Sequence, residues 1–130
     1  MQAQRQVAGG LEASAATTFD ALAWEIELAG ARCIFLDKLI GELMQTMPVE
    51  ERTRLMEGMH AVDLLSQHLT GLSAFARKIS ESVSEDVQVP VQAAIDDITL
   101  GVLADRMSTA FGGEEMGINQ GDDAGDLDLF

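Results

Sequence analysis

The sequence is short of several residue types, and each shortage excludes a class of protein. Only one of the 130 residues is a cysteine, so no disulfide can form within the chain. The chain has only 8 lysines and arginines but 22 aspartates and glutamates, and the resulting formal net charge of −14 argues against nucleic acids and anionic membranes as partners. No apolar run approaches the roughly 18 residues that a transmembrane helix needs, and no signal peptide is recognisable. We therefore expect a cytoplasmic protein whose partner has a basic surface.

The scarcity of strand and turn formers favours a helical protein. There are 2 prolines and no tyrosine, while alanine, leucine and glutamate are abundant. A hydrophobic content of 47% is enough for a core in a single domain. The composition therefore predicts an all-α fold.

Two long stretches repeat apolar residues every seven positions, which is typical of helices that pack along their whole length. The first is predicted from about Thr17 to Met47 and the second from Pro48 to about Asp86. In heptad notation, the a positions are Phe19, Ile26, Cys33, Ile40 and Met47, then Leu55, Val62, Leu69, Ala76 and Val83. The d positions are Leu22, Ala29, Leu36 and Leu43, then Leu65, Leu72 and Ile79. We expect these a and d residues to form the seam between the two helices.

The connection between the two helices, residues 46–51, is so short that they must run antiparallel. Four apolar residues of the first helix lie outside the predicted seam and would be exposed to water in a two-helix hairpin: Leu28, Ile34, Phe35 and Leu39. We therefore expect the hairpin to complete an elongated four-helix bundle, and we favour a homodimer over cover by the rest of the chain.

The remaining segments are predicted to be appendages to this hairpin. Residues 1–16 are expected to form a flexible arm, helical at most from Leu11 onward, with Thr17 and Asp20 capping the first long helix. Residues 87–89 are expected to be extended before Pro90, which opens a short third helix to about Phe111. Residues 17–111 thus hold the hairpin and third helix. The acidic composition of residues 112–130 predicts a disordered tail.

An acid and an amide lie four residues apart on the second long helix. In the heptad register Asp63 is a b position and Gln67 an f position, so both point away from the predicted seam. The pair is either a solvated surface pair or a site that another protein contacts.

The end of the tail has a pattern that a purely solvating tail does not need. It alternates acids with apolar residues: Asp122, Asp123, Asp126, Leu127, Asp128, Leu129 and Phe130. Acidic segments with apolar anchors are typical of peptides that fold on a basic partner. Both interpretations, solvating tail and docking peptide, stay open.

Together, the hairpin, the Asp63/Gln67 pair and the peptide at residues 122–130 resemble the CheZ chemotaxis phosphatases. In length the chain is similar to the small CheZ-like proteins called CheT. The resemblance implies a dimeric bundle that acts on a CheY-type response regulator. It implies that Gln67 orients a water for in-line attack on the regulator's aspartyl phosphate, while Asp63 contacts the regulator's active-site lysine. Mg²⁺ belongs to the regulator, so no cofactor is expected on this chain.

A second alignment with the same family exists. The family's segment often reads like Gln-Asp-Leu-Thr-Gly-Gln, and residues 67–72 read Gln-His-Leu-Thr-Gly-Leu. In that register His68 replaces the acid and Leu72 replaces the amide, which would leave the protein inactive. We prefer Asp63 and Gln67, because the heptad predicts that Leu72 faces the seam.

Two other functions fit a helical bundle in signalling. One is a non-catalytic CheZ-like adaptor that binds another chemotaxis protein, such as a basic receptor-modifying enzyme; Trp24, an f position, would be exposed for such a contact. The other, less favoured, is a histidine phosphotransfer protein, for which Glu57 and Asp63 beside His60 are unfavourable neighbours. The spacing of the histidines and Cys33 predicts no metal site.

Overall fold

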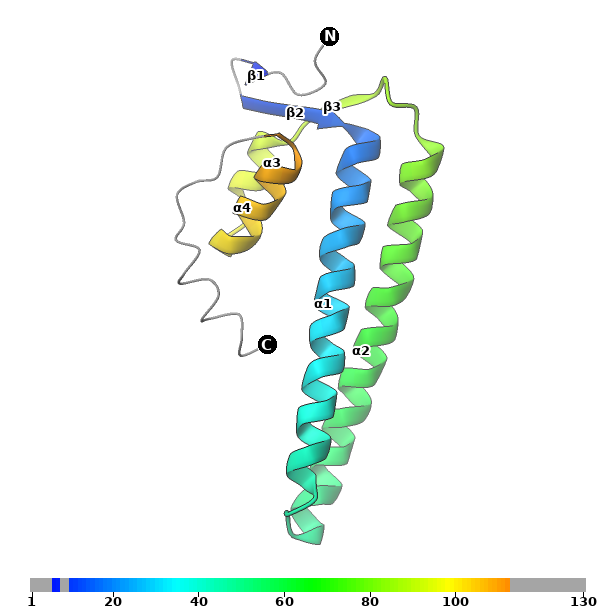
Figure 1. The fold of residues 1–130 in the computed structure, drawn as a ribbon, viewed down its shortest axis with the longest axis vertical. Coiled ribbons are helices and arrows are strands. Elements are labelled where there is room, and N and C mark those ends of the chain that lie inside the picture. Colours follow the sequence, from blue (N-terminus) through cyan, green and yellow to red (C-terminus); the bar gives the residue numbers. More distant parts are fainter. Residues whose placement is uncertain (1–5, 8–9, 113–130) are drawn as a thin grey trace. The chain divides into compact units, whose positions relative to one another are not determined.

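The computed structural model of the chain describes residues 6–7 and 10–112 (Figure 1). It is mostly helical, with two long helices that pack together and a small sheet. The elements are β1 (Gln6–Val7), β2 (Gly10–Ser14), α1 (Ala15–Met44), α2 (Val49–Ser82), β3 (Gln88–Pro90), α3 (Gln92–Asp96) and α4 (Gly101–Ala110). Two compact units share α1 and α2. One holds the described residues up to Leu22 and from Ala76 onward, and the other, the hairpin unit, holds residues 23–75.

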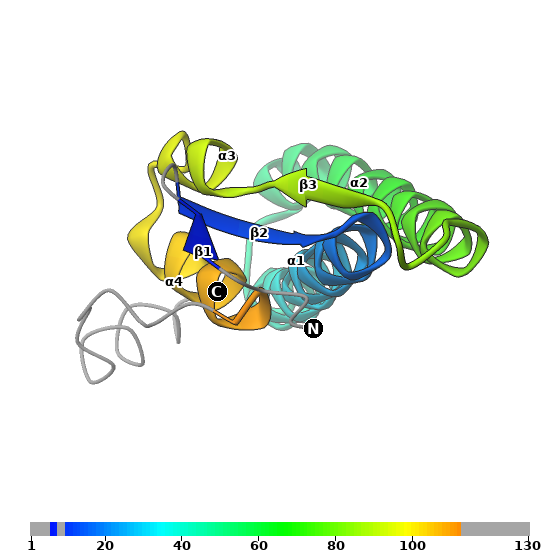
Figure 2. The same cartoon turned by 90° about the horizontal axis from the view of Figure 1, so that it is seen from above.

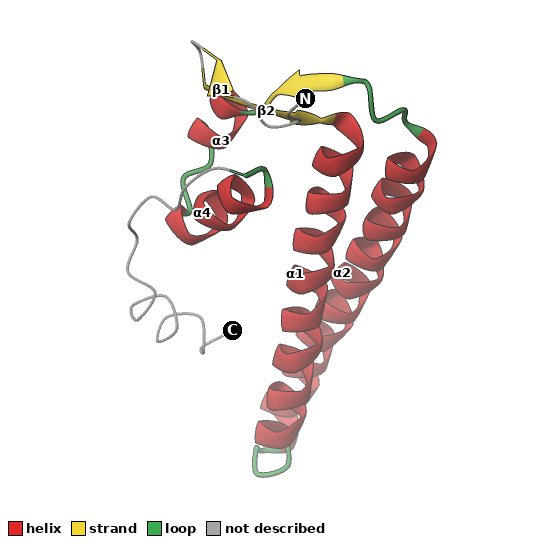
Figure 3. Ribbon diagram, turned by 45° about the horizontal axis from the view of Figure 1, so that its top comes forward, coloured by secondary structure: helices red, strands yellow, loops and turns green. Residues whose placement is uncertain are grey.

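Residues Gly10–Ser14 form a strand, so the prediction of a loose or helical arm is wrong there. β2 pairs antiparallel with β1 and β3, as Figures 2 and 3 show. Leu11 and Ala13 alternate with half-buried neighbours and are themselves buried, which is the two-residue period of a strand. The predicted extended segment before Pro90 is confirmed as β3, and its register places Ala13 opposite Val89.

The first long helix begins at Ala15, two residues before the predicted start. The Ser14 hydroxyl accepts a hydrogen bond from the Thr17 N–H at 3.0 Å, which is the geometry of a helix N-cap. The Thr18 hydroxyl closes the same turn by donating to the Ser14 carbonyl. Ser14 therefore has the capping role that the sequence analysis gave to Thr17.

The predicted third helix is two helices. α3 ends at Asp96, and Leu100 is extended (φ −83°, ψ 105°) before α4 begins at Gly101. The β-branched pair at residues 98–99 favours this interruption. The predicted glycine stop is confirmed, because Gly112 adopts a positive φ of 88° directly after Phe111.

The buried apolar core lies in the unit that contains the sheet. Phe111 is the largest fully buried side chain. Its cluster comprises Leu11, Ala13, Val91, Ile95 and Phe111, with Ala21, Val89, Ala104 and Met107 packed against it. Of the buried apolar residues of the described chain, only Ala23 belongs to the hairpin unit. The hairpin unit therefore has no core of large side chains of its own.

The predicted hairpin turn is confirmed. α1 ends at Met44, and α2 begins at Val49 directly after Pro48. The Pro48 carbonyl accepts the Arg52 N–H at 2.9 Å, and Glu50 and Glu51 lie in the first turn, where the helix dipole favours acids.

Only half of the predicted seam is confirmed. All the a residues are buried or half-buried, but five of the d residues are exposed: Leu22, Ala29, Leu43, Leu65 and Leu72. The helices meet instead through a and e positions. The Ser73 hydroxyl donates to the Ala23 carbonyl at 3.0 Å, and a Cβ added at Gly30 would lie 3.6 Å from the Leu69 Cβ.

Side-chain size explains this change of seam. In the half of the hairpin away from the turn, the e positions hold Ala16, Ala23 and Gly30 on α1, and Ser66, Ser73 and Ser80 on α2. Such small residues let the backbones approach, and the Ser73 and Ser80 hydroxyls then reach carbonyls of the facing helix. Leucines at d would hold the axes nearer to the usual 8–10 Å separation.

The excluded d residues lie on one side of the hairpin unit, and most of them are exposed. With a and e at the seam, the d and g positions of antiparallel helices fall on the same side of the hairpin. We call this side the apolar face: Leu36, Leu39 and Leu43 of α1, with Leu65, Leu72 and Phe75 of α2. Leu72 is 52% exposed and Phe75 64%. Patches of this kind mark interaction sites.

Candidate functional site

Asp63 and Gln67 lie next to one another on α2, as the sequence analysis predicted. The Gln67 Nε2 donates a hydrogen bond to the Asp63 Oδ2 at 3.0 Å, and both side chains are exposed. A spacing of four residues on a helix brings the side chains together, and such a pair adds about 0.2–0.5 kcal/mol to helix stability. The location of the pair is thus confirmed, whereas its catalytic role stays a prediction.

The hydrogen bond defines what this pair can do chemically. With its nitrogen held by Asp63, the Gln67 amide offers its carbonyl oxygen to a water, which can donate a hydrogen bond to it. The remaining lone pairs of the Asp63 carboxylate can accept from a cationic donor of a partner. The arrangement therefore suits positioning of a water beside a positive charge.

The pair lies on the side of the hairpin opposite the apolar face. Its b and f positions are about 80–120° from the seam in one direction, while d and g lie in the other. A protein that covers the apolar face would therefore leave Asp63 and Gln67 accessible.

The exposure of Leu72 contradicts the prediction that this residue faces the seam. Leu72 does not face α1, because it is half exposed on the apolar face. The second alignment is therefore not excluded by the hairpin seam. In that register the chain would have no turnover, since leucine has no atom that can hydrogen-bond a water.

Other candidate residues are placed as follows. His60 and His68 are exposed on α2, and Trp24 is 58% exposed on α1, as its f position predicted. The docking segment, Asp122 to Phe130, lies outside the described residues. Among residues 6–7 and 10–112, no three histidine, cysteine or acidic side chains lie close enough to share a metal ion. No helix in this part of the chain is long and apolar enough to cross a membrane.

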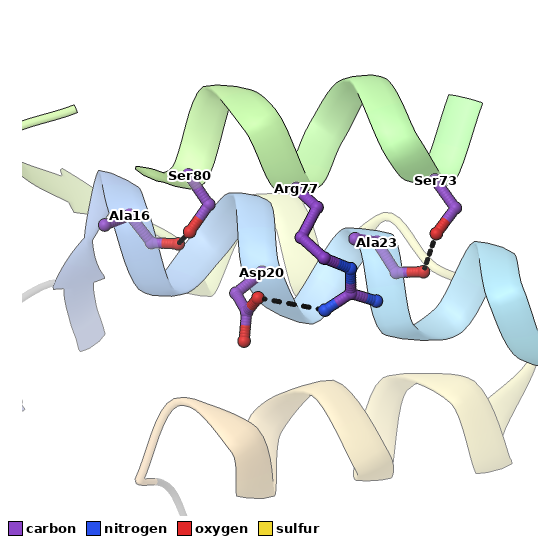
Figure 4. Close-up of polar contacts among 6 residues, drawn as sticks. All are labelled: Ala16, Asp20, Ala23, Ser73, Arg77 and Ser80. Atoms are coloured by element: carbon purple, nitrogen blue, oxygen red, sulfur yellow. Dashed lines mark hydrogen bonds and ion pairs between the residues drawn. The ribbon is translucent and has the colours of Figure 1, made fainter. Parts of the chain in front are cut away.

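The sequence analysis missed the polar contacts that join α1 and α2 (Figure 4). Besides the Ser73 contact, the Ser80 hydroxyl donates to the Ala16 carbonyl at 2.8 Å, and Arg77 pairs with Asp20 at 3.3 Å. The seven-residue spacing of Ser66, Ser73 and Ser80 is the signal that could have revealed this row. Its position opposite small residues of α1 makes it a packing device that holds the site's helix in place.

The family model described as "Domain of unknown function (DUF8776)" matches residues 16–130. No curated protein and no solved structure matches the chain.

Proposed function

We propose that this chain, which belongs to the DUF8776 family, is a CheZ-like chemotaxis protein that binds a CheY-type response regulator and dephosphorylates its aspartate. The supporting observation is the Asp63–Gln67 pair, which is hydrogen-bonded at 3.0 Å and exposed on a long helix. Because it is exposed on a helix, the pair can be inserted into the active site of a second protein. Helical backbone also keeps both groups in fixed relative positions.

The chemistry asks little of this chain beyond positioning. The attacking water forms a bond to phosphorus while the bond from phosphorus to the regulator's aspartate oxygen breaks, which releases inorganic phosphate and a free carboxylate. Gln67 accepts a hydrogen bond from the water and so aligns its oxygen with the breaking bond. Asp63 pairs with the regulator's lysine. The regulator's own Mg²⁺ neutralises charge on the phosphoryl oxygens.

A second copy of the chain is the proposed occupant of the apolar face, which completes a four-helix bundle. The hairpin unit buries no large side chain, although its helices carry many exposed ones. The six residues of the apolar face expose on the order of 500 Å² per copy, before the small residues between them are counted, against about 800 Å² per partner in a standard interface. A dimer formed in this way leaves both Asp63–Gln67 pairs accessible.

The acidic peptide at residues 122–130 is proposed to dock on a basic surface of the same regulator. Its acids supply long-range electrostatic attraction, which salt screens. Its apolar contacts, which salt does not screen, come from Leu127, Leu129 and Phe130. The peptide would then raise the local concentration of the regulator near the helical site.

The decisive measurement is phosphate release from acetyl-phosphate-charged CheY-type regulators of the source cell. Gln67→Ala should reduce the acceleration about 100-fold or more, because a misplaced nucleophile loses that much. Regulator binding and helicity should stay unchanged, since Gln67 is exposed. Asp63→Ala should reduce both turnover and affinity. The matched control is Gln45→Ala, an exposed glutamine in the hairpin turn, which should be silent.

A different result would replace the phosphatase with the adaptor. If the unmodified chain binds a regulator or a receptor-modifying enzyme but accelerates no phosphate release, the pair has no catalytic role. If turnover occurs and Gln67→Ala leaves it unchanged, another residue positions the water.

A further inference from the structure

We infer that the binding surface for the partner extends across the hairpin from Asp63 and Gln67 on α2 to α1, where Ile34 and Trp24 are its apolar anchors. The inferred occupant is the phosphorylated receiver domain, so the inference rests on the proposed function. Its basis is the position of Ile34 along the hairpin, the side on which both residues lie, and their exposure.

The position of Ile34 along the hairpin follows from two contacts between α1 and α2. A Cβ added at Gly30 would lie 3.6 Å from the Leu69 Cβ, and one added at Gly41 would lie 3.9 Å from the Met59 Cε. Between these two levels of an antiparallel pair, Ile34 lies opposite about residue 65. Ile34 is therefore at the same height along the hairpin as the turn of α2 that joins Asp63 to Gln67.

The side of the hairpin follows from the heptad positions. Ile34 is a b position, like Asp63, and Trp24 is an f position, like Gln67. Because a and e form the seam of antiparallel helices, the b and f positions of both helices lie on the same side. Ile34 is thus no farther from the pair than about one usual interhelical spacing of 8–10 Å. It lies on the opposite side from the apolar face.

The exposure of these residues marks them as anchors. Ile34 is 62% exposed and Trp24 58%, and Ala31 continues the row between them with spacings of seven and three residues. Neither large side chain contributes to a buried core. Tryptophan is enriched among interface hot spots, and apolar centres beside polar groups are the usual anatomy of an interface.

The chemistry of this surface fits a receiver domain better than a second copy of the chain. A second copy bound through this same surface would bring two identical surfaces together, and the Asp63 carboxylates of the two chains would repel one another. A phosphorylated receiver offers instead a lysine and Mg²⁺ beside the phosphoaspartate. Asp63 and Gln67 would enter that centre while Ile34 and Trp24 pack on its rim.

The test separates binding from turnover by substituting the anchors alone. Ile34→Ser and Trp24→Ser should each weaken affinity for receivers loaded with beryllofluoride and Mg²⁺ about tenfold. KM for the phosphorylated regulator should rise by the same factor, while kcat stays within twofold. The matched control is Val49→Ser. Like Ile34, Val49 is exposed (68%), β-branched and at a b position. It lies 14 residues before Asp63, which is about 21 Å along α2. It should leave affinity unchanged, and Ile34→Val should restore most of the affinity lost in Ile34→Ser.

Each result decides the inference separately from the catalytic proposal. If both serine variants bind like the unmodified chain, or if Val49→Ser weakens binding as much, α1 supplies no anchor and the inference is wrong. If the serine variants weaken binding while Gln67→Ala is silent, the inferred surface is supported and the catalytic role of Gln67 is wrong. If no regulator of the source cell binds the unmodified chain, both fail.

Discussion

Gly30 offers the sharpest test of the seam, because the structure distinguishes a methyl group there from a larger side chain. A Cβ at this position would make ordinary van der Waals contact with the Leu69 Cβ at 3.6 Å. Nothing lies within 4 Å of a Cβ added at Gly58, which is exposed on α2. Alanine should therefore fit at both positions, whereas leucine should fit only at Gly58.

The expected magnitudes follow from helix propensity and packing. Either glycine-to-alanine change should raise the free energy of unfolding by about 1 kcal/mol, because alanine is the better helix former. Leucine has nearly the same propensity, so Gly58→Leu should resemble Gly58→Ala. Gly30→Leu must push Leu69 and the facing helix away, which costs about 1–3 kcal/mol relative to Gly30→Ala.

The assay is urea unfolding of the four variants at a concentration low enough for the chain to be monomeric, because Gly58 is a d position on the side of the apolar face and association would alter the apparent stability. Comparing the alanine-to-leucine step at Gly30 with the same step at Gly58 cancels propensity and leaves the packing cost. If the two steps are equal within about 0.5 kcal/mol, α1 and α2 do not approach closely at Gly30. The seam through a and e positions would then be wrong.

Two further predictions concern the surfaces of the chain. Leu65→Asp, on the apolar face, should convert a dimer of twice 13.9 kDa into a helical monomer, whereas Leu69→Asp, in the seam, should unfold the hairpin. Sedimentation and circular dichroism distinguish these outcomes. If the dimer persists in Leu65→Asp, the apolar face is not its interface. Deleting residues 122–130 should weaken regulator binding and leave helicity unchanged, and replacing Leu127, Leu129 and Phe130 by serine should do nearly the same; binding that responds to salt alone would make the segment a generic acidic tail.

Much of the helical hairpin could be predicted from the sequence because its signals are local and repeated. The a series, the turn before Pro48 and the exposure of Asp63 and Gln67 all follow from seven-residue spacing and loop length. The d series could not be assigned correctly from spacing alone. Leucines at d and serines at e compete for the same seam, and the choice depends on how closely Ala23 and Gly30 let the backbones approach.

The sheet was missed because its strands are too short to carry a pattern of their own. β2 has five residues, and only Leu11 and Ala13 alternate inward. Its strand conformation depends on pairing with β3, about 75 residues later in the chain, so no local window contains the evidence. The break between α3 and α4 is similar, because Leu100 becomes extended in a segment whose ends are fixed by packing around Ile95 and Phe111.

The two units of the chain divide burial and recognition between them. Where the sheet, α3 and α4 come together, apolar residues are buried in a core that holds itself together. In the hairpin unit the same kinds of residue stay exposed, and folding does not remove them from water. A hairpin closed by small residues is narrow, so it leaves most of each helix surface for other contacts. Leucines and Phe75 occupy one side, and Asp63, Gln67, Ile34 and Trp24 occupy the other. Under the proposed function, this separation would let a second copy cover one surface permanently while the regulator binds to the other and leaves.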